Sequence, residues 1–126
     1  MQKLIIPGEL ATMNEIIAKS KSHYAVYSKL KKRHTENVIA EAAGLEPVEK
    51  AHFVFSWHCR NKRKDPDNIA AGGTKMILDG LVEAGVMKND GWGDVASITH
   101  HFYQDKERPR VEVEIYEVRN GTNADD

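Results

Sequence analysis

The feature that most constrains the fold is a strand pattern at Ala51–Cys59. Every second residue of this segment is apolar or small and falls on one face: Ala51, Phe53, Phe55, Trp57 and Cys59. Alternation with a period of two is typical of a β-strand with one buried face. A sheet must bury such a face against other elements, so the rest of the chain has to supply helices that cover it.

The remaining pattern predicts three more strands and two main helices. We expect strands at 4–6, 95–103 and 110–118, helices at 28–43 and 67–84, and a loop or irregular helix at 9–27. Gly72-Gly73 disfavours the start of the second helix, which could begin only at Thr74 or be kinked there. The order β-α-β-α-β-β, with an antiparallel hairpin through 105–109, predicts an α/β (α+β) fold with a mixed sheet of about four strands.

Length and composition indicate one soluble domain. The chain has 126 residues, 40% hydrophobic and 29% charged, and we expect a domain over 1–118 with a disordered tail over 119–126. A single cysteine favours a reducing, cytoplasmic setting. No apolar run approaches the ~20 residues of a membrane span, and no nucleotide-binding or zinc motif is present, so neither a membrane nor a small-molecule cofactor is expected.

The net charge of −1 is low for a nucleic-acid-binding protein. The cations are nevertheless concentrated in two stretches, 19–33 and 60–64, while acidic residues gather near the C-terminus. This distribution is compatible with a basic working face, and equally with ordinary solvated surfaces.

Two acidic residues, Asp65 and Asp67, follow the strand and the second basic stretch. Functional groups of α/β proteins usually lie just beyond the carboxyl ends of strands. Pro66 biases Asp65 toward extended backbone, in which side chains two apart point the same way. Converging carboxylates stay ionised when a cation lies between them, and carboxylate oxygen suits Mg²⁺, or Mn²⁺ in its place. The alternative is that Asp67 or Asn68 only caps the next helix.

Three further residues are candidates for the same site. A third acidic ligand is expected in the loop 88–94, where Asp90 competes with Asp94. Lys75 could stabilise negative charge on a phosphate, although an ion pair with Asp79, four residues on, is the simpler interpretation. Trp92 is a candidate for stacking on a base.

These motifs resemble the RusA family of Holliday junction resolvases over roughly residues 3–118. The resemblance rests on Lys64-Asp65-Pro66-Asp67-Asn68, then Lys75-x-x-x-Asp79-Gly80-Leu81, Gly85-Val86 and Asn89-Asp90. Ile6-Pro7-Gly8 with Asn14-Glu15 is similar to versions of the family found in phages and prophages. The chain departs from compact members at Ala71, where they carry the lysine, because a segment with Gly72-Gly73 looks inserted.

The resemblance implies a homodimer that cuts four-way DNA junctions in recombination and repair, with Mg²⁺. It implies catalytic, metal-binding roles for Asp65, Asp67 and Asp90, and a catalytic role for Lys75. Many members carry an acidic doublet at the third position, and here its first member is Asn89, which favours Asp90. The DNA contacts expected are Lys62, Arg63, Lys64, Asn14 and Trp92.

We therefore predict a structure-selective endodeoxyribonuclease. Two other hypotheses stay open: a non-catalytic branched-DNA-binding protein that has kept the fold, and a small metal-dependent hydrolase of soluble phosphate esters.

Overall fold

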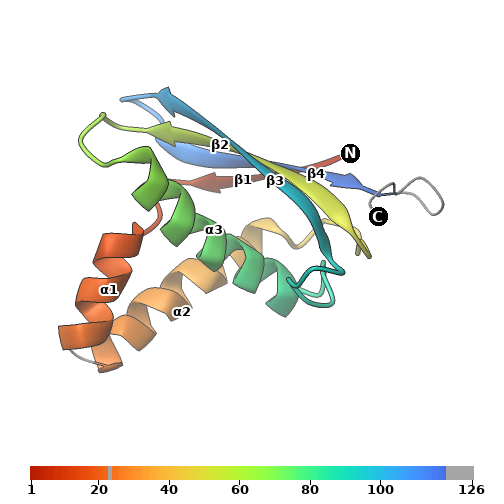
Figure 1. Ribbon diagram of the computed structural model, residues 1–126, viewed down its shortest axis with the longest axis horizontal. Helices are drawn as coiled ribbons and strands as arrows, with labels where there is room; N and C mark the ends of the chain where they lie inside the picture. Colours follow the sequence, from red (N-terminus) through yellow and green to blue (C-terminus); the bar gives the residue numbers. More distant parts are fainter. Residues whose placement is uncertain (23, 119–126) are drawn as a thin grey trace.

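The computed structural model describes residues 1–22 and 24–118, so the predicted tail over 119–126 lies outside the described residues. Four strands and three helices make up this part of the chain (Figure 1). In chain order they are β1 (Gln2–Pro7), α1 (Met13–Ser22), α2 (Tyr24–Glu41), β2 (Ala51–Cys59), α3 (Pro66–Glu83), β3 (Val95–Gln104) and β4 (Arg110–Glu117). The prediction of a mixed sheet of about four strands packed with helices is confirmed.

The sheet has the order β1-β4-β2-β3. β3 pairs with β2 in parallel, as expected for a crossover through α3, and β4 pairs antiparallel with both β1 and β2. The prediction that β3 and β4 form an antiparallel hairpin is wrong, because β2 lies between them. Residues 105–109 instead cross the end of β2, where the backbone N–H of Asp105 donates to the carbonyl of Cys59.

The segment 9–27, predicted to be loop or irregular helix, contains the regular helix α1 and the first residues of α2. A capping box starts the helix: Thr12 Oγ1 accepts the backbone N–H of Glu15, and Glu15 Oε1 accepts the backbone N–H of Thr12. The hydrogen bond from Thr12 also lowers the pKa of Glu15. The Thr-x-x-Glu spacing could therefore have predicted the start of α1 from the sequence.

All three helices lie on one face of the sheet (Figure 1). The core forms between them and the inner sides of the strands, with Phe53, Phe55, Ile77, Leu81 and Val113 fully buried. The alternation predicted for Ala51–Cys59 is confirmed, since Phe53, Phe55 and Trp57 all point into this core. No helix of the described residues is long and apolar enough to cross a membrane.

Helix α3 is continuous through Gly72 and Gly73, so the predicted late start or kink at Thr74 is not observed. Both glycines are positions of close approach. A Cβ on Gly72 would overlap the backbone of residues 11–13, and a Cβ on Gly73 would overlap the indole of Trp57. The low helix propensity of glycine is offset here by packing that a larger residue would prevent.

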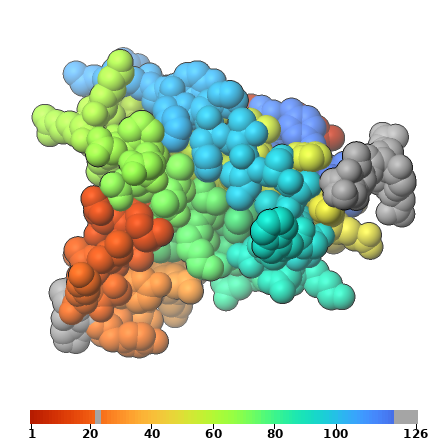
Figure 2. Space-filling view, in the orientation of Figure 1, coloured from red at the N-terminus to blue at the C-terminus, as the bar shows by residue number. Residues whose placement is uncertain are grey.

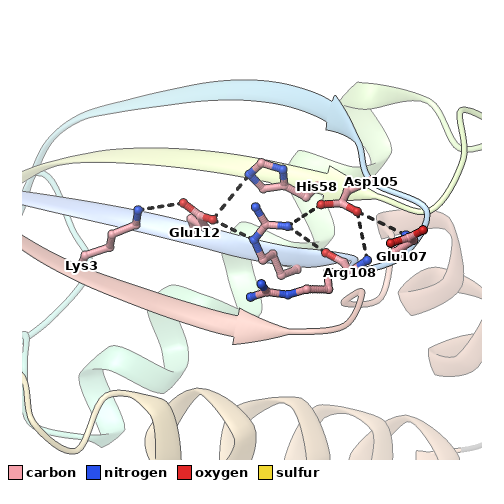
Figure 3. A network of polar contacts seen from close by, with 7 residues as sticks. Lys3, His58, Asp105, Glu107, Arg108 and Glu112 are labelled. Atoms are coloured by element: carbon pink, nitrogen blue, oxygen red, sulfur yellow. Dashed lines mark hydrogen bonds and ion pairs between the residues drawn. The ribbon is translucent and has the colours of Figure 1, made fainter.

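The opposite face of the sheet carries a polar network (Figure 3). Glu112 on β4 lies 2.8 Å from Nζ of Lys3 and 2.8 Å from Nε of Arg110, and Arg110 also reaches Asp105. The hydrogen bonds from Lys3 and Arg110 lower the pKa of Glu112 to about 2. This network joins β1, β4 and the 105–109 turn on the face that the helices leave uncovered.

Candidate active site

Asp65 and Asp67 lie at the first turn of α3, directly after the loop that leaves β2. Asp65 occupies the N-cap position in extended backbone (φ −72°, ψ 142°), as Pro66 was expected to impose, and its side chain makes no capping hydrogen bond. The helix begins at Pro66, so Asp67 is helical and the backbone is not extended through both aspartates as predicted. Both side chains are exposed. The alternative that Asp67 or Asn68 caps this helix is wrong, because Asp65 holds the N-cap position and both residues lie inside the helix.

The helix dipole favours anionic groups at this position. Asp67 Oδ1 accepts the backbone N–H of Asn68, which leaves its other oxygen available to a ligand. The carboxylates of Asp65 and Asp67 are therefore exposed to solvent at the start of α3, and that hydrogen bond engages only one of Asp67's two oxygens.

The loop before Asp65 is fixed to the N-terminal segment. The backbone N–H of Arg60 donates to Glu9 Oε2 at 2.7 Å. Nζ of Lys64 lies 3.6 Å from Glu15 Oε1 and 4.0 Å from Glu9 Oε1. Lys64, predicted to contact DNA, thus has two carboxylate neighbours within its own chain, and it links the acid pair to the start of α1.

The other predicted DNA contacts fall into two groups. Three of them lie near the acid pair, and Trp92 lies in the loop between α3 and β3. Lys62 and Arg63 are exposed in the loop before Asp65. Asn14 is at the start of α1, where its backbone N–H donates to Oδ1 of Asn68 at 3.1 Å. Trp92 is 98% exposed, and so contributes nothing to the core.

Lys75 and Asp90 line a groove between α2 and α3, away from the first turn of α3. The groove is about 840 Å³ and is also lined by Lys31, Lys32 and Asp79. Lys75 Nζ lies 3.2 Å from Asp79 Oδ1, and Lys31 Nζ lies 3.7 Å from Asp79 Oδ2. The hydrogen bond with Asp79, and to a smaller extent the charge of Asp90, raises the pKa of Lys75 and keeps it cationic.

The two candidates for the third acid lie in different surroundings. The carboxylate of Asp94 accepts the backbone N–H of Gly91 at 3.2 Å, which closes the turn of its loop. Asp90 has its backbone N–H bonded to Asn89 and borders the groove beside Lys75. These surroundings favour Asp90 over Asp94 as the residue available to a ligand.

The structure does not bring the three predicted acids to one point within the chain. Lys75 is eight residues after Asp67, about 12 Å along a helix at 1.5 Å per residue, and Asp90 lies on the Lys75 side. Among residues 1–22 and 24–118, no three His, Cys, Asp or Glu side chains are placed to hold a metal ion. The carboxylates are the right donors for a hard divalent cation, but within one chain they do not form the expected three-acid site.

Exposed carboxylates bordered by lysine and arginine at the end of a mixed sheet define a class of site suited to phosphate esters. The family model for endodeoxyribonuclease RusA matches residues 6–116, so the chain belongs to the RusA family. The family implies Holliday junction resolvase endonuclease activity, and its nucleases are generally dependent on divalent metals. No curated protein matches the chain.

Proposed function

We propose that this protein is a Mg²⁺-dependent endonuclease that resolves four-way DNA junctions during recombination or repair. The observation that carries the proposal is the exposed Asp65 and Asp67 pair at the start of α3, in a chain of the RusA family. Mg²⁺ is proposed because carboxylate oxygens are hard ligands, and Mg²⁺ is usually bound through one or two carboxylates while it keeps several waters.

The protein's own residues suggest a division of roles. Lys62 and Arg63 are exposed beside the acid pair and would hold the phosphate backbone by charge. Lys75, kept cationic by Asp79, would stabilise negative charge that develops on the phosphate. The indole of Trp92 is exposed and does not pack in the core, and it would stack on a base at the junction.

A homodimer is part of the proposal, and the edge strand β3 is the surface that supports it. The ten residues of β3 include no Asp, Glu, Lys or Arg, and Ile98, Phe102 and Tyr103 are 40–50% exposed. Long, uncharged edge strands readily pair with another chain, whereas the other edge, β1, is shorter and carries Lys3 and Pro7. A dimer with two-fold symmetry would match the approximate two-fold symmetry of a four-way junction.

Antiparallel pairing of two β3 strands would also change the surroundings of each site. β3 begins just after the loop that carries Asp90 and Trp92, and it ends level with Cys59. The loop of one copy would therefore approach the end of the partner's sheet, where the partner's acid pair lies. Because the acids do not meet within one chain, this pairing offers a way for two copies to share a site.

The experiment compares a synthetic four-way junction with linear duplex of the same sequence, each incubated with the protein and Mg²⁺. We expect symmetric nicks in the junction, little cutting of the duplex, and no cutting with EDTA. Equal cutting of both substrates would contradict the junction selectivity. Junction binding without cutting by the unsubstituted protein would favour the non-catalytic DNA-binding alternative.

A further inference from the structure

The most uneven charge in the chain lies in the hairpin of α1 and α2. Residues 16–35 contain six lysines and arginines and no aspartate or glutamate: Lys19, Lys21, Lys29, Lys31, Lys32 and Arg33. All 19 acidic residues of the chain lie outside this segment, although the net charge of the whole protein is −1. A strongly cationic element on a slightly acidic protein is a local feature that overall charge does not explain.

Three of these cations share one face of α2. Lys29, Lys32 and Arg33 are spaced i, i+3 and i+4, which places them on neighbouring turns of the same side, and all three are exposed. Like charges at this spacing repel each other and destabilise a helix. An anion that lies across these three side chains would relieve this repulsion.

The packing of α1 against α2 extends the cluster into a concave surface. A hollow of about 460 Å³ between these helices is lined by Lys19 from α1 and by Lys29, Arg33, Val26 and Leu30 from α2. Its polar lining residues are therefore all cations. Lys31 and Lys32 continue the same charge around α2 into the groove that holds Lys75 and Asp90.

The hairpin also begins beside the acid pair. The start of α1 is joined to the first turn of α3 through Asn14 and Asn68, and the hairpin projects away from there (Figure 2). Lys19 and Lys21 lie six and eight residues into α1, about 10 Å from its start at 1.5 Å per residue. This distance corresponds to roughly three phosphates along one strand of DNA.

We propose that the α1–α2 hairpin is a sequence-independent contact for the phosphate backbone of a DNA duplex arm, distinct from the basic loop 60–64. The inference rests on the proposed function, since it takes DNA at the acid pair as its starting point. Exposed, closely spaced lysines and arginines suit the backbone, which carries the same charge in every sequence. The hairpin would hold an arm of the junction while the acid pair lies at the strand to be cut.

The test is the salt dependence of DNA binding for two matched double variants. Lys29→Gln/Arg33→Gln removes two charges from the hairpin, and Lys50→Gln/Lys106→Gln removes two charges elsewhere. Binding of a fluorescent four-way junction is measured with EDTA present, from about 50 to 200 mM salt, with thermal melting as a check of the fold. Each lost phosphate contact lowers the slope of log K against log salt by about 0.9.

We expect the hairpin variant to lose about two units of slope, to bind roughly 60-fold more weakly at ~0.1 M salt, and to melt no lower than the parent. The control variant should keep the parent's slope. Equal slopes in the hairpin variant and the control, with normal junction cutting by the parent, would overturn the hairpin's role alone. Absence of DNA binding by the parent would overturn both this inference and the proposed function.

Discussion

Nζ of Lys64 lies 3.6 Å from the carboxylate of Glu15, which also accepts the backbone N–H of Thr12. One carboxylate thus starts helix α1 and anchors the residue next to the acid pair. The position of Asp65 therefore depends on a helix that is distant from it in the sequence.

The first prediction concerns this link. Glu15→Gln keeps an oxygen that can accept from Thr12 but removes the charge that Lys64 and the helix start favour, so we expect a loss of about 1 kcal/mol of unfolding free energy. We also expect slower junction cutting, because the loop before Asp65 loses a contact. Urea unfolding and cleavage rates check both. Glu41→Gln, an exposed change on α2, should stay within about 0.5 kcal/mol, and equal effects of the two variants would contradict the link.

The second prediction concerns the glycines of α3. Gly73→Ala adds a methyl group where the indole of Trp57 lies, so we expect a loss of about 1–3 kcal/mol from overpacking, although alanine favours a helix by about 1 kcal/mol. Gly44→Ala is the control, because nothing lies within 4 Å of its added Cβ. Denaturant midpoints compare the two. A stabilised Gly73→Ala protein would show that α3 does not approach β2 as closely as described.

The third prediction follows from the polar network on the open face. Hydrogen bonds from Lys3 and Arg110 hold the pKa of Glu112 at about 2, below its ordinary 4.5. The folded state therefore binds fewer protons at this site than the unfolded state, so stability from Glu112 is present above pH 4.5 and is lost as the pH falls toward 2. Urea unfolding over this range should show a shallower decline for Glu112→Gln than for the parent.

A matched control for the network lies two residues along the same strand. Glu114 accepts a hydrogen bond from the Tyr116 hydroxyl and does not share the contacts of Glu112 with Lys3 and Arg110. Glu114→Gln should therefore keep more of the parent's loss of unfolding free energy at low pH than Glu112→Gln does. The same decline in the parent and in Glu112→Gln would mean that Glu112 does not contribute to it.

The strands were the most predictable part of the fold. The predicted bounds of β2 agree with the observed strand, and the predicted bounds of β3 and β4 differ from the observed ones by one residue at the C-terminal end. The neighbours of β4 were not predictable in the same way. A short connection favours a hairpin, but β2 has the more continuous apolar face and occupies the position between β3 and β4, which is a property of the whole sheet.

The geometry of the candidate site was predictable only in part. The strand, Pro66 and the two aspartates gave the place and backbone of Asp65 correctly. The relation of that pair to Asp90 depends on the length of α3 and on the path of residues 84–94, which carry no periodic signal. The glycines that looked like a disruption of α3 instead let it pack closely, and this continuous helix separates Lys75 from Asp67 by two turns.

The fourth prediction separates the two interpretations of Lys75. If Lys75 stabilises charge on the phosphate, Lys75→Gln should slow cutting by about 100-fold or more while junction binding changes little. Lys31→Gln is the matched control, because Lys31 contacts the same Asp79. Single-turnover cleavage at saturating protein provides the measurement. Equal cleavage rates for both variants and the parent would show that Lys75 only forms a surface ion pair with Asp79.

We propose that the aspartates at the start of α3 carry out DNA cutting. The most direct measurement sets Asp67→Asn beside the parent on one four-way junction, and records binding with EDTA and cutting with Mg²⁺. Because the carboxylate is exposed and is not needed as a cap, Asp67→Asn should fold and bind like the parent and lose cutting by at least about 100-fold. Unchanged cutting by Asp67→Asn would show that this carboxylate takes no part in the reaction.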